Sequence, residues 1–293
     1  MLSDDHGANW RQAKVPVSVS LTATQFVSAR VGWVVGHGGV VLATTDGGET
    51  WRRQLDGRKA AQIEFDAAQG EGAAGKRLRD AERLVKEGPD KPFLDLYFSD
   101  ERNGLVIGAY GLIFVTTDGG QRWRSAQQRL DNPKGRHLYG LRAVGKALYL
   151  VGEQGAAYRS DDGGQRFVEL KTPYAGSYFG VVGAATGEVI VFGLRGHAYW
   201  SADAGANWQQ SEIATGSTLT AGLRFADGSL LLVNESGQAF RSVNGGRSFN
   251  PLTIAQPSPY TGVAQAADGG VILSGVRGIT RVVPAALTAG GKP

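Results

Sequence analysis

Cysteine is absent from this chain of 293 residues, and histidine is scarce. Without cysteine the protein can form no disulfide framework, thiolate zinc site, iron–sulfur centre or cysteine nucleophile. The four histidines, His6, His37, His137 and His197, form no His-x-His or His-Glu-x-x-His pair. The chain also has no phosphate loop and no Gly-x-Ser-x-Gly elbow. We therefore expect neither a metal site nor a cofactor.

Long hydrophobic runs and runs of basic residues are missing as well. No apolar stretch approaches the ~18 residues that a membrane span requires, and the N-terminus MLSDDHGANW lacks the basic and apolar regions of a signal peptide. The net charge is +4 and the pI about 9.3, but Lys and Arg are interleaved with acidic residues. We expect no direct membrane insertion and no nucleic-acid partner. The absence of cysteine leaves the compartment open.

Glycine, by contrast, is abundant, with 44 residues, about twice its ordinary share of ~7%. It follows no Gly-X-Y period, so a collagen-like structure is excluded. Gly tolerates positive φ angles, and many short strands joined by tight turns would require such a content.

One eight-residue motif, Ser/Thr-x-Asp-x-Gly-x-x-aromatic, occurs six times. The copies are SDDHGANW, TTDGGETW, TTDGGQRW, SDDGGQRF, SADAGANW and SVNGGRSF. Their acidic or amide positions are Asp5, Asp46, Asp118, Asp162, Asp203 and Asn244, and their aromatic positions are Trp10, Trp51, Trp123, Phe167, Trp208 and Phe249. The aromatic positions are 41, 72, 44, 41 and 41 residues apart. The long interval indicates an insertion.

A tight turn of the form Gly-x-x-Gly precedes the motif, and apolar runs flank it. Examples of these runs are GWVV, GLVI and VIVF before the turn and VVLATT and LIFVTT after it. Such β-branched and aromatic runs between glycine turns are typical of strand–turn–strand. Each unit of about 41 residues is therefore predicted to form four short strands. For the whole chain this pattern predicts an all-β fold, a β-propeller of four-stranded blades. We interpret the Asp as a turn-former and the aromatic residue as packing between blades.

The two ends of the chain leave the number of blades open. The first motif copy has no turn before it, and the last turn, Gly275 to Gly278, has no motif after it. Residues 1–15 could complete the last blade with residues 260–285, which gives six blades in one domain, 1–293. Alternatively, the native chain begins upstream and has a seventh, N-terminal blade.

The insertion is helical and spans residues 56–91. Within AAGKRLRDAERLVKEG, Leu78, Ala81, Leu84 and Val85 recur at helical spacing with charged residues between them, and GPDKP ends the pattern. The insertion either packs on the propeller or forms a docking element for a protein partner.

The motif copies match the bacterial neuraminidase (BNR) or Asp-box repeat. The whole pattern, with VVGHGGVVLATTDGGETW and VIGAYGLIFVTTDGGQRW as its best examples, resembles the photosystem II stability/assembly factor-like propeller family. GPDKPFLDLYFSDERNGLVIGAYG is similar to its bacterial, non-photosynthetic branch. The resemblance implies a seven-bladed, commonly exported propeller that assists assembly of a membrane complex. For the bacterial branch it implies a periplasmic accessory role beside membrane transport complexes.

We expect a monomeric, non-enzymatic binding scaffold that recognises a protein or peptide partner. In a propeller, the turns between second and third strands share one face around the channel mouth. That face would collect His37, Tyr110, Glu153, Gln154, Arg195 and Arg277. The alternative is a sialidase-like glycoside hydrolase, because sialidases share the repeat and require an Arg cluster, a Tyr nucleophile with a Glu partner, and an Asp. This enzyme would need Arg195, Arg277, Tyr110 and Glu153 to converge in one pocket with a carboxylate pair, for which Glu153 and Asp95 are candidates.

Overall fold

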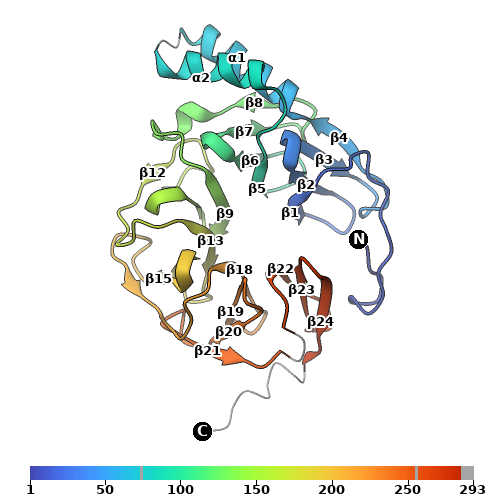
Figure 1. Ribbon diagram of the computed structural model, residues 1–293, viewed down its shortest axis with the longest axis vertical. Helices are drawn as coiled ribbons and strands as arrows, with labels where there is room; N and C mark the ends of the chain where they lie inside the picture. The colour runs from blue at the N-terminus through green and yellow to red at the C-terminus, as the bar shows by residue number, and fades with distance from the viewer. Residues whose placement is uncertain (73–74, 255–256, 285–293) are drawn as a thin grey trace.

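The computed structural model describes residues 1–72, 75–254 and 257–284. In this part of the chain, small antiparallel sheets follow one another around a central axis, and two helices lie at the periphery (Figure 1). The prediction of an all-β, propeller-like fold is confirmed.

Three sheets come from the N-terminal half of the chain, each with its strands in sequence order. The first contains β1 (Leu21–Phe26), β2 (Gly32–Gly36), β3 (Val40–Thr44) and β4 (Arg52–Leu55). The second contains β5 (Phe93–Phe98), β6 (Gly104–Gly108), β7 (Ile113–Thr116) and β8 (Arg124–Ser125). The third contains β9 (Leu138–Val144), β10 (Ala147–Gly152), β11 (Ala157–Ser160) and β12 (Val168–Glu169).

Three more sheets come from the C-terminal half. The fourth contains β13 (Tyr178–Gly183), β14 (Val189–Gly193), β15 (Ala198–Ser201) and β16 (Gln209–Gln210). The fifth contains β18 (Leu219–Arg224), β19 (Leu230–Asn234), β20 (Ala239–Ser242) and β21 (Ser248–Leu252), and β17 (Glu212–Ile213) joins it in parallel beside β21. The sixth is three-stranded in the described residues, with β22 (Tyr260–Gln265), β23 (Val271–Gly275) and β24 (Gly278–Val282).

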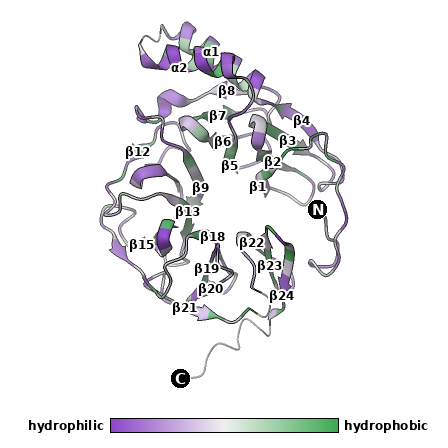
Figure 2. Ribbon diagram, viewed as in Figure 1, coloured by the Kyte–Doolittle hydropathy of each residue, from purple (hydrophilic) through white to green (hydrophobic). Residues whose placement is uncertain are grey.

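The second strand of each sheet carries most of the hydrophobic sequence. Every residue of β2, β6, β10, β14 and β19 is buried, and Figure 2 shows hydrophobic residues concentrated on the strands. Neighbouring sheets cover both faces of these strands, so the runs are continuously apolar rather than alternating. This is why runs such as GLVIG and VIVFG predicted the strands well.

Large aromatic side chains fill the space between neighbouring sheets. The Trp33 ring stacks on Phe98 of the next sheet with ring centroids 3.7 Å apart. Trp123, from the third motif copy, meets the same Phe98 edge-on at 6.2 Å. The Trp33–Phe98 stack joins the first sheet to the second, whereas the Trp123–Phe98 contact lies within the second sheet. Edge-on aromatic pairs are a favourable arrangement.

The repeated motif forms the turn between the third and fourth strands of five sheets, and all six copies have the same hydrogen bonds. In the third copy the Thr116 hydroxyl donates to Asp118 (2.9 Å) and accepts from the Gly120 amide (2.8 Å), while the Arg122 amide donates to Asp118 (2.9 Å). The corresponding bonds recur in the other five copies, and in the last one Asn244 accepts in place of Asp. The side chains thereby satisfy main-chain donors that the tight turn leaves unpaired.

The N-terminal segment lies between the last and the first sheet (Figure 1). Arg281 on β24 donates from Nε to the main-chain oxygen of His6 (3.0 Å). On the other side, Lys14 forms a parallel bridge with Thr50, and Arg11 forms an ion pair with Glu49. No pairing between residues 1–15 and β24 is found in the described residues. Closure of the ring by strand pairing with residues 260–285, of which residue 285 lies outside the described part, stays a prediction.

The contact of Arg281 with the N-terminal segment repeats a contact seen elsewhere between neighbouring sheets. Arg159 of the third sheet donates to the main-chain oxygen of Ala204, the fourth residue of the motif in the fourth sheet (3.2 Å). His6 is the fourth residue of the first motif copy. Arg159 and Arg281 also occupy the same position in their sheets. Arg159 pairs with Tyr149 on β10 and Arg281 with Ile272 on β23, and each partner lies three residues before the end of its strand. The N-terminal motif copy thus faces the last sheet as the motif of a following sheet does.

The contact with the first sheet shows the same regularity. Glu212, four residues after Trp208, forms a parallel bridge with Ser248, the residue before Phe249. Lys14, four residues after Trp10, forms its bridge with Thr50, the residue before Trp51. Residues 2–14 therefore contain a motif turn and a short segment after it, and they contact the last sheet on one side and the first sheet on the other.

Two helices, rather than one, lie between β4 and β5. They are α1 (Gly57–Gly70), which Asp56 caps through the Lys59 amide, and α2 (Lys76–Glu87). The sequence pattern predicted α2 and missed α1. Ala81 and Leu84 are buried as their spacing indicated, whereas Val85 is 45% exposed. In the described part of the chain, no helix has both the length and the apolar character needed to cross a membrane.

The aspartates in the motif turns predict that the stability of the fold depends on pH. Hydrogen bonds from the Thr50 side chain and amide and from Thr44 lower the pKa of Asp46 to about 2, and bonds from Asn207 and Ser201 do the same for Asp203. A carboxyl group whose pKa is lowered in the folded state stabilises that state at pH values above its ordinary pKa, near 3.8. This contribution is lost as the pH falls toward 2. We expect the thermal midpoint to fall between pH 4 and pH 2. The fall should be smaller for the double variant Asp46→Asn/Asp203→Asn, whose amides cannot titrate.

The natural Asn244 indicates that an amide can hold this turn, so the double variant should fold at pH 7. Asp46→Ala/Asp203→Ala, which lacks the acceptors, should have a lower midpoint at every pH. Identical pH profiles for the wild type and the asparagine variant would contradict the assignment of the transition to these carboxylates.

Candidate functional site

The turns between second and third strands gather at one end of the sheets. Antiparallel pairing places the end of β2 opposite the start of β1, with Gly36 opposite Leu21, and the same register recurs between β6 and β5. We call this end the turn face. The motif turns lie at the opposite end, because they follow the third strands.

All six residues predicted for the binding face lie on the turn face. His37, Tyr110, Glu153, Gln154 and Arg195 belong to one-turn 3-10 segments between second and third strands, and Arg277 lies in the turn between β23 and β24. Glu153 is half-buried and the other five are exposed. The structure thus displays the six side chains at one end but on five different sheets.

Three of these turns hold a side chain in a backbone conformation that favours glycine. Tyr110, Gln154 and Arg195 have φ angles of 57°, 53° and 58°, and the equivalent position in the first sheet is Gly38, with φ 70°. A left-handed conformation is unfavourable for residues with a Cβ. Three successive sheets therefore carry a side chain where glycine would be less strained.

The structure brings Tyr110 and Glu153 together through His137, which the sequence pattern did not single out. The Tyr110 and His137 ring centroids are 5.0 Å apart. The His137 amide donates to the Glu153 carboxylate (2.7 Å). The contacts continue from His137 to Tyr139 (6.2 Å) and from Tyr139 to Phe179 (5.0 Å). We call Tyr110, His137, Tyr139 and Phe179 the aromatic row.

Strand geometry explains the last two members of the row. Tyr139 and Phe179 are the second residues of β9 and β13, and the residues before them, Leu138 and Tyr178, are fully buried. Successive strand residues point to opposite sides, so Tyr139 and Phe179 are left partly exposed. A partly exposed aromatic at the second position of a first strand is the signal that could have found them.

Charged groups lie beside two members of the aromatic row, Tyr110 and Tyr139. The Lys91 ammonium lies 4.8 Å from the centre of its ring, within the range of a cation–π contact. Burial opposes the charge of Lys91, but hydrogen bonds to Asp90 and Glu87 raise its pKa overall, so the cation persists at neutral pH. Further along the row, burial and then the charge of Glu153 raise the pKa of Tyr139, so its hydroxyl remains a donor.

A cavity of about 420 Å³ lies between α2 and residues 127–135 and reaches Tyr110. Its charged lining residues are Glu64, Lys76, Arg77, Asp80, Arg83, Lys91, Asp131 and Lys134. Most of these are in ion pairs, such as Lys76 with Asp80 and Lys91 with Glu87. The cavity connects the helical segment to the turn face.

A buried carboxylate fixes α1 and α2 to the second sheet. Glu64 on α1 is 1% exposed, accepts from Arg77 on α2 (3.0 Å) and accepts from the Ser125 hydroxyl on β8. Ala60, Ala61 and Leu84 belong to the same apolar core as Phe93 and Leu112. The helices are therefore part of the core packing and not only a surface attachment.

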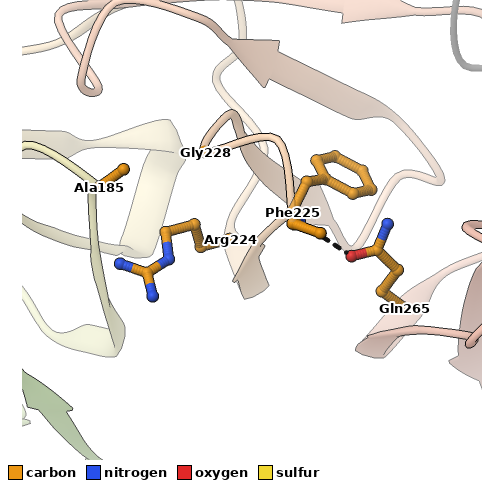
Figure 3. A pocket seen from close by; sticks show the side chains of 6 residues that line it. Ala185, Arg224, Phe225, Gly228 and Gln265 are labelled. Carbon is orange, nitrogen blue, oxygen red and sulfur yellow. Dashed lines mark hydrogen bonds between the residues drawn. The ribbon is translucent and has the colours of Figure 1, made fainter.

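A second, more open cavity of about 530 Å³ lies at the other end of the sheets (Figure 3). It is lined by Ala185, Arg224, Phe225, Ala226, Gly228 and Gln265. The Gln265 carbonyl accepts from the Ala226 amide (3.1 Å), which fixes the turn between β18 and β19 to the next sheet. Its polar groups serve contacts between sheets.

The convergence required for a glycoside hydrolase is not seen at the turn face. The cavity beneath α2 is lined by Tyr110 but by none of Glu153, Arg195 and Arg277. Asp95 is 4% exposed and accepts from the amides of Leu96 and Leu141 and from Arg142. Over residues 1–72, 75–254 and 257–284, no group of three or more acidic or histidine side chains could hold a metal ion.

Comparison with known proteins gives one family match. The model of the photosynthesis system II assembly factor YCF48 family matches residues 2–76 and 80–252. A curated relative, the photosystem II assembly lipoprotein Ycf48 of Synechococcus sp. (strain CC9902), is 30% identical over 77 residues. That match covers 26% of this chain and 23% of the relative's own length.

Solved structures of the same fold include YCF48 bound to D1 peptide. Its TM-score is 0.64 at 20% identity, covering 89% of this chain and 77% of that chain. YCF48 from Cyanidioschyzon merolae has a TM-score of 0.66 at 22% identity, covering 94% and 85%. The GH74 xyloglucanase from Xanthomonas campestris scores 0.64 at 16% identity, covering 92% and 46%. Identities this low show the fold alone, and this fold occurs in both assembly factors and hydrolases.

The buried carboxylate beneath the cavity predicts a large stability effect. Glu64→Ala should lower the free energy of unfolding by about 3 kcal/mol, because it leaves the Arg77 guanidinium and the Ser125 hydroxyl without their buried acceptor. Arg77 keeps its second partner, Glu71, which places the expected loss at the low end for a broken buried pair. Urea unfolding measures this loss. Lys76→Ala, which removes an exposed pair, is the control and should cost less than about 1 kcal/mol.

Proposed function

This chain belongs to the YCF48 assembly factor family, and we propose that it is a non-enzymatic scaffold that binds a protein or peptide during assembly of a membrane or envelope complex. The family match over residues 2–76 and 80–252 carries the proposal. A solved YCF48 holds a D1 peptide, which supports a peptide partner for this chain as well. The turn face, with its exposed side chains and its connection to the cavity beneath α2, is the proposed contact surface.

The identity of the complex is a finer part of the proposal. The resemblance of residues 88–111 to the bacterial, non-photosynthetic branch favours an envelope complex, such as a membrane transport complex, over a photosystem. The relative from Synechococcus is a lipoprotein by name, which supports a location at the envelope, in the periplasm of a bacterium. We propose that the scaffold acts as a monomer.

Capture from detergent-solubilised membranes of the native host tests this function. The wild-type chain should retain a membrane protein, and Arg195→Ala/Arg277→Ala should reduce the retained amount about ten-fold or more, equal to about 1.4 kcal/mol of binding free energy. Both arginines are exposed on the turn face. Arg166→Ala, an exposed change at the motif end of the third sheet, is the matched control and should retain the protein. Equal capture by all three chains would count against the turn face.

Glycoside hydrolysis is the second candidate, favoured only by the shared fold and by Tyr110 and Glu153 lying on either side of His137. Release of reducing sugar from xyloglucan or a sialoside, abolished by Glu153→Gln, would favour it over the scaffold.

We propose further that the propeller has seven blade positions, with residues 2–14 supplying the motif turn and the outer strand of the seventh. The contacts of His6 with Arg281 and of Lys14 with Thr50 support this count, because each repeats a contact between successive sheets. A six-position ring would instead have residues 1–15 complete the last blade beside β24.

The absence of cysteine allows a clean cross-linking test of the seventh position. In the variant His6→Cys/Arg281→Cys, a short bis-maleimide should cross-link the two cysteines within one chain. If the polypeptide is then cut once between them, the cross-linked fragments stay together and the gel mobility reports the cross-link. Asn9→Cys/Arg281→Cys should join less, because Asn9 lies three residues further along the N-terminal segment. More efficient joining at Asn9 than at His6 would support the six-position ring.

A further inference from the structure

The rings of the aromatic row are tilted against one another. Successive interplanar angles are 54° between Tyr110 and His137, 70° between His137 and Tyr139, and 59° between Tyr139 and Phe179. Rings tilted in this way do not form one flat surface. A flat platform for a sugar ring needs an open aromatic face, whereas here each ring packs against the next. Small, rigid apolar groups such as a pyrrolidine ring can pack against tilted aromatic rings.

The row has a spacing that suits an extended peptide. Ring centroids are 5.0–6.2 Å apart along the row. A polyproline II segment rises about 3.1 Å per residue, so about two residues span each step. Such a segment is already extended before binding and has no internal hydrogen bonds, which leaves its carbonyls free to accept from donors of the protein.

One carboxylate lies beside the middle of the row. Glu153 accepts the His137 amide through one oxygen, and its other oxygen lies 3.9 Å from the His137 ring nitrogen. The Tyr139 hydroxyl also interacts with this carboxylate. A carboxylate has about four acceptor positions, so capacity remains for a ligand beside these two partners. The Glu153 side chain is 31% exposed. A guanidinium or ammonium of the ligand would find a charge partner here.

The backbone at Tyr110 adds an independent observation. Its φ of 57° is a left-handed value at a position where the first sheet has Gly38. Tyr110 is 47% exposed, and its ring contacts the Lys91 ammonium and the His137 ring. Residues in such strained backbone conformations cluster at ligand-binding and other functional positions. The ring is thus displayed rather than buried.

We propose that the aromatic row binds a proline-rich segment in the polyproline II conformation, with a basic residue of that segment against Glu153. This inference rests on the proposed peptide-binding function and assigns the chemistry of the peptide. Aromatic-lined grooves recognise such segments in other proteins by the same physics.

Fluorescence anisotropy with a labelled peptide of sequence Arg-Pro-Leu-Pro-Pro-Leu-Pro tests the proposal. Saturable binding to the full chain is expected, with at least ten-fold weaker binding of the same peptide with alanine in place of proline. Equal binding of the two peptides, or no saturable binding, would overturn it. Binding of cellohexaose that Tyr139→Ala abolishes, without peptide binding, would assign the row to carbohydrate instead.

Tyr110→Gly separates binding from folding. The change removes the ring and relieves the left-handed backbone, so we expect at least ten-fold weaker peptide binding with a thermal midpoint no lower than that of the wild type. Ala204→Gly is the matched control, because Ala204 has φ 59° on a motif turn at the opposite end and should leave binding unchanged. Wild-type affinity in Tyr110→Gly would contradict the role of the row.

Glu153→Gln tests the charge. It should weaken binding of the arginine peptide about five-fold or more and leave unchanged the binding of a peptide with norleucine in place of arginine. If Glu153→Gln weakened binding of both peptides, the substitution would have altered the packing of the aromatic row rather than removed a charge partner. If peptide binding fails while membrane capture remains sensitive to Arg195→Ala/Arg277→Ala, this inference is wrong and the scaffold function stands; if both fail, both are wrong.

Discussion

The hydroxyl–carboxylate turn between third and fourth strands is the contact on which the rest of the structure depends. Each copy ties three consecutive features together, the end of a third strand, a tight glycine turn and the aromatic residue that follows. Fourth strands as short as two residues, such as β8 and β12, have few ladder bonds of their own. The turn therefore supplies much of the order that places Trp123 and Phe167 between neighbouring sheets. Because the turn uses only local hydrogen bonds, it can be repeated around the ring without adjustment.

The sequence was sufficient for the sheets because their information is local. Continuous apolar runs such as GLVIG and the spacing of the motif report burial and turns directly, and the strands begin and end close to these signals. The aromatic row was not predictable in the same way. His137, Tyr139 and Phe179 lie in unremarkable sequence, and they meet Tyr110 only because three sheets converge at the turn face. Helix α1 escaped prediction because GRKAAQIEFDAAQG is weakly amphipathic, and its burial depends on Glu64 finding Arg77 and Ser125.

Rigid sheets and strained turns have complementary roles in this molecule. The second strands are completely buried and give the turn face a fixed base. On that base, Tyr110, Gln154 and Arg195 occupy left-handed positions that glycine would fill at lower cost. A repeat scaffold can bear this cost in a few turns, since the free energy that holds each sheet comes from its neighbours. Side chains on different sheets can also change independently, so one architecture can present different surfaces to different ligands.

The position of residues 2–14 has a consequence for how the chain folds. The bond between His6 and Arg281 joins residues 275 positions apart, so nearly all of the chain must be in place before it can form. The entropic cost of closing so long a loop grows only slowly with loop length. Contacts between residues this distant in sequence nevertheless slow folding. During synthesis residues 2–14 leave the ribosome long before their partner on β24 does. The seam between the last and first sheets can accordingly close only after the intervening sheets have been made.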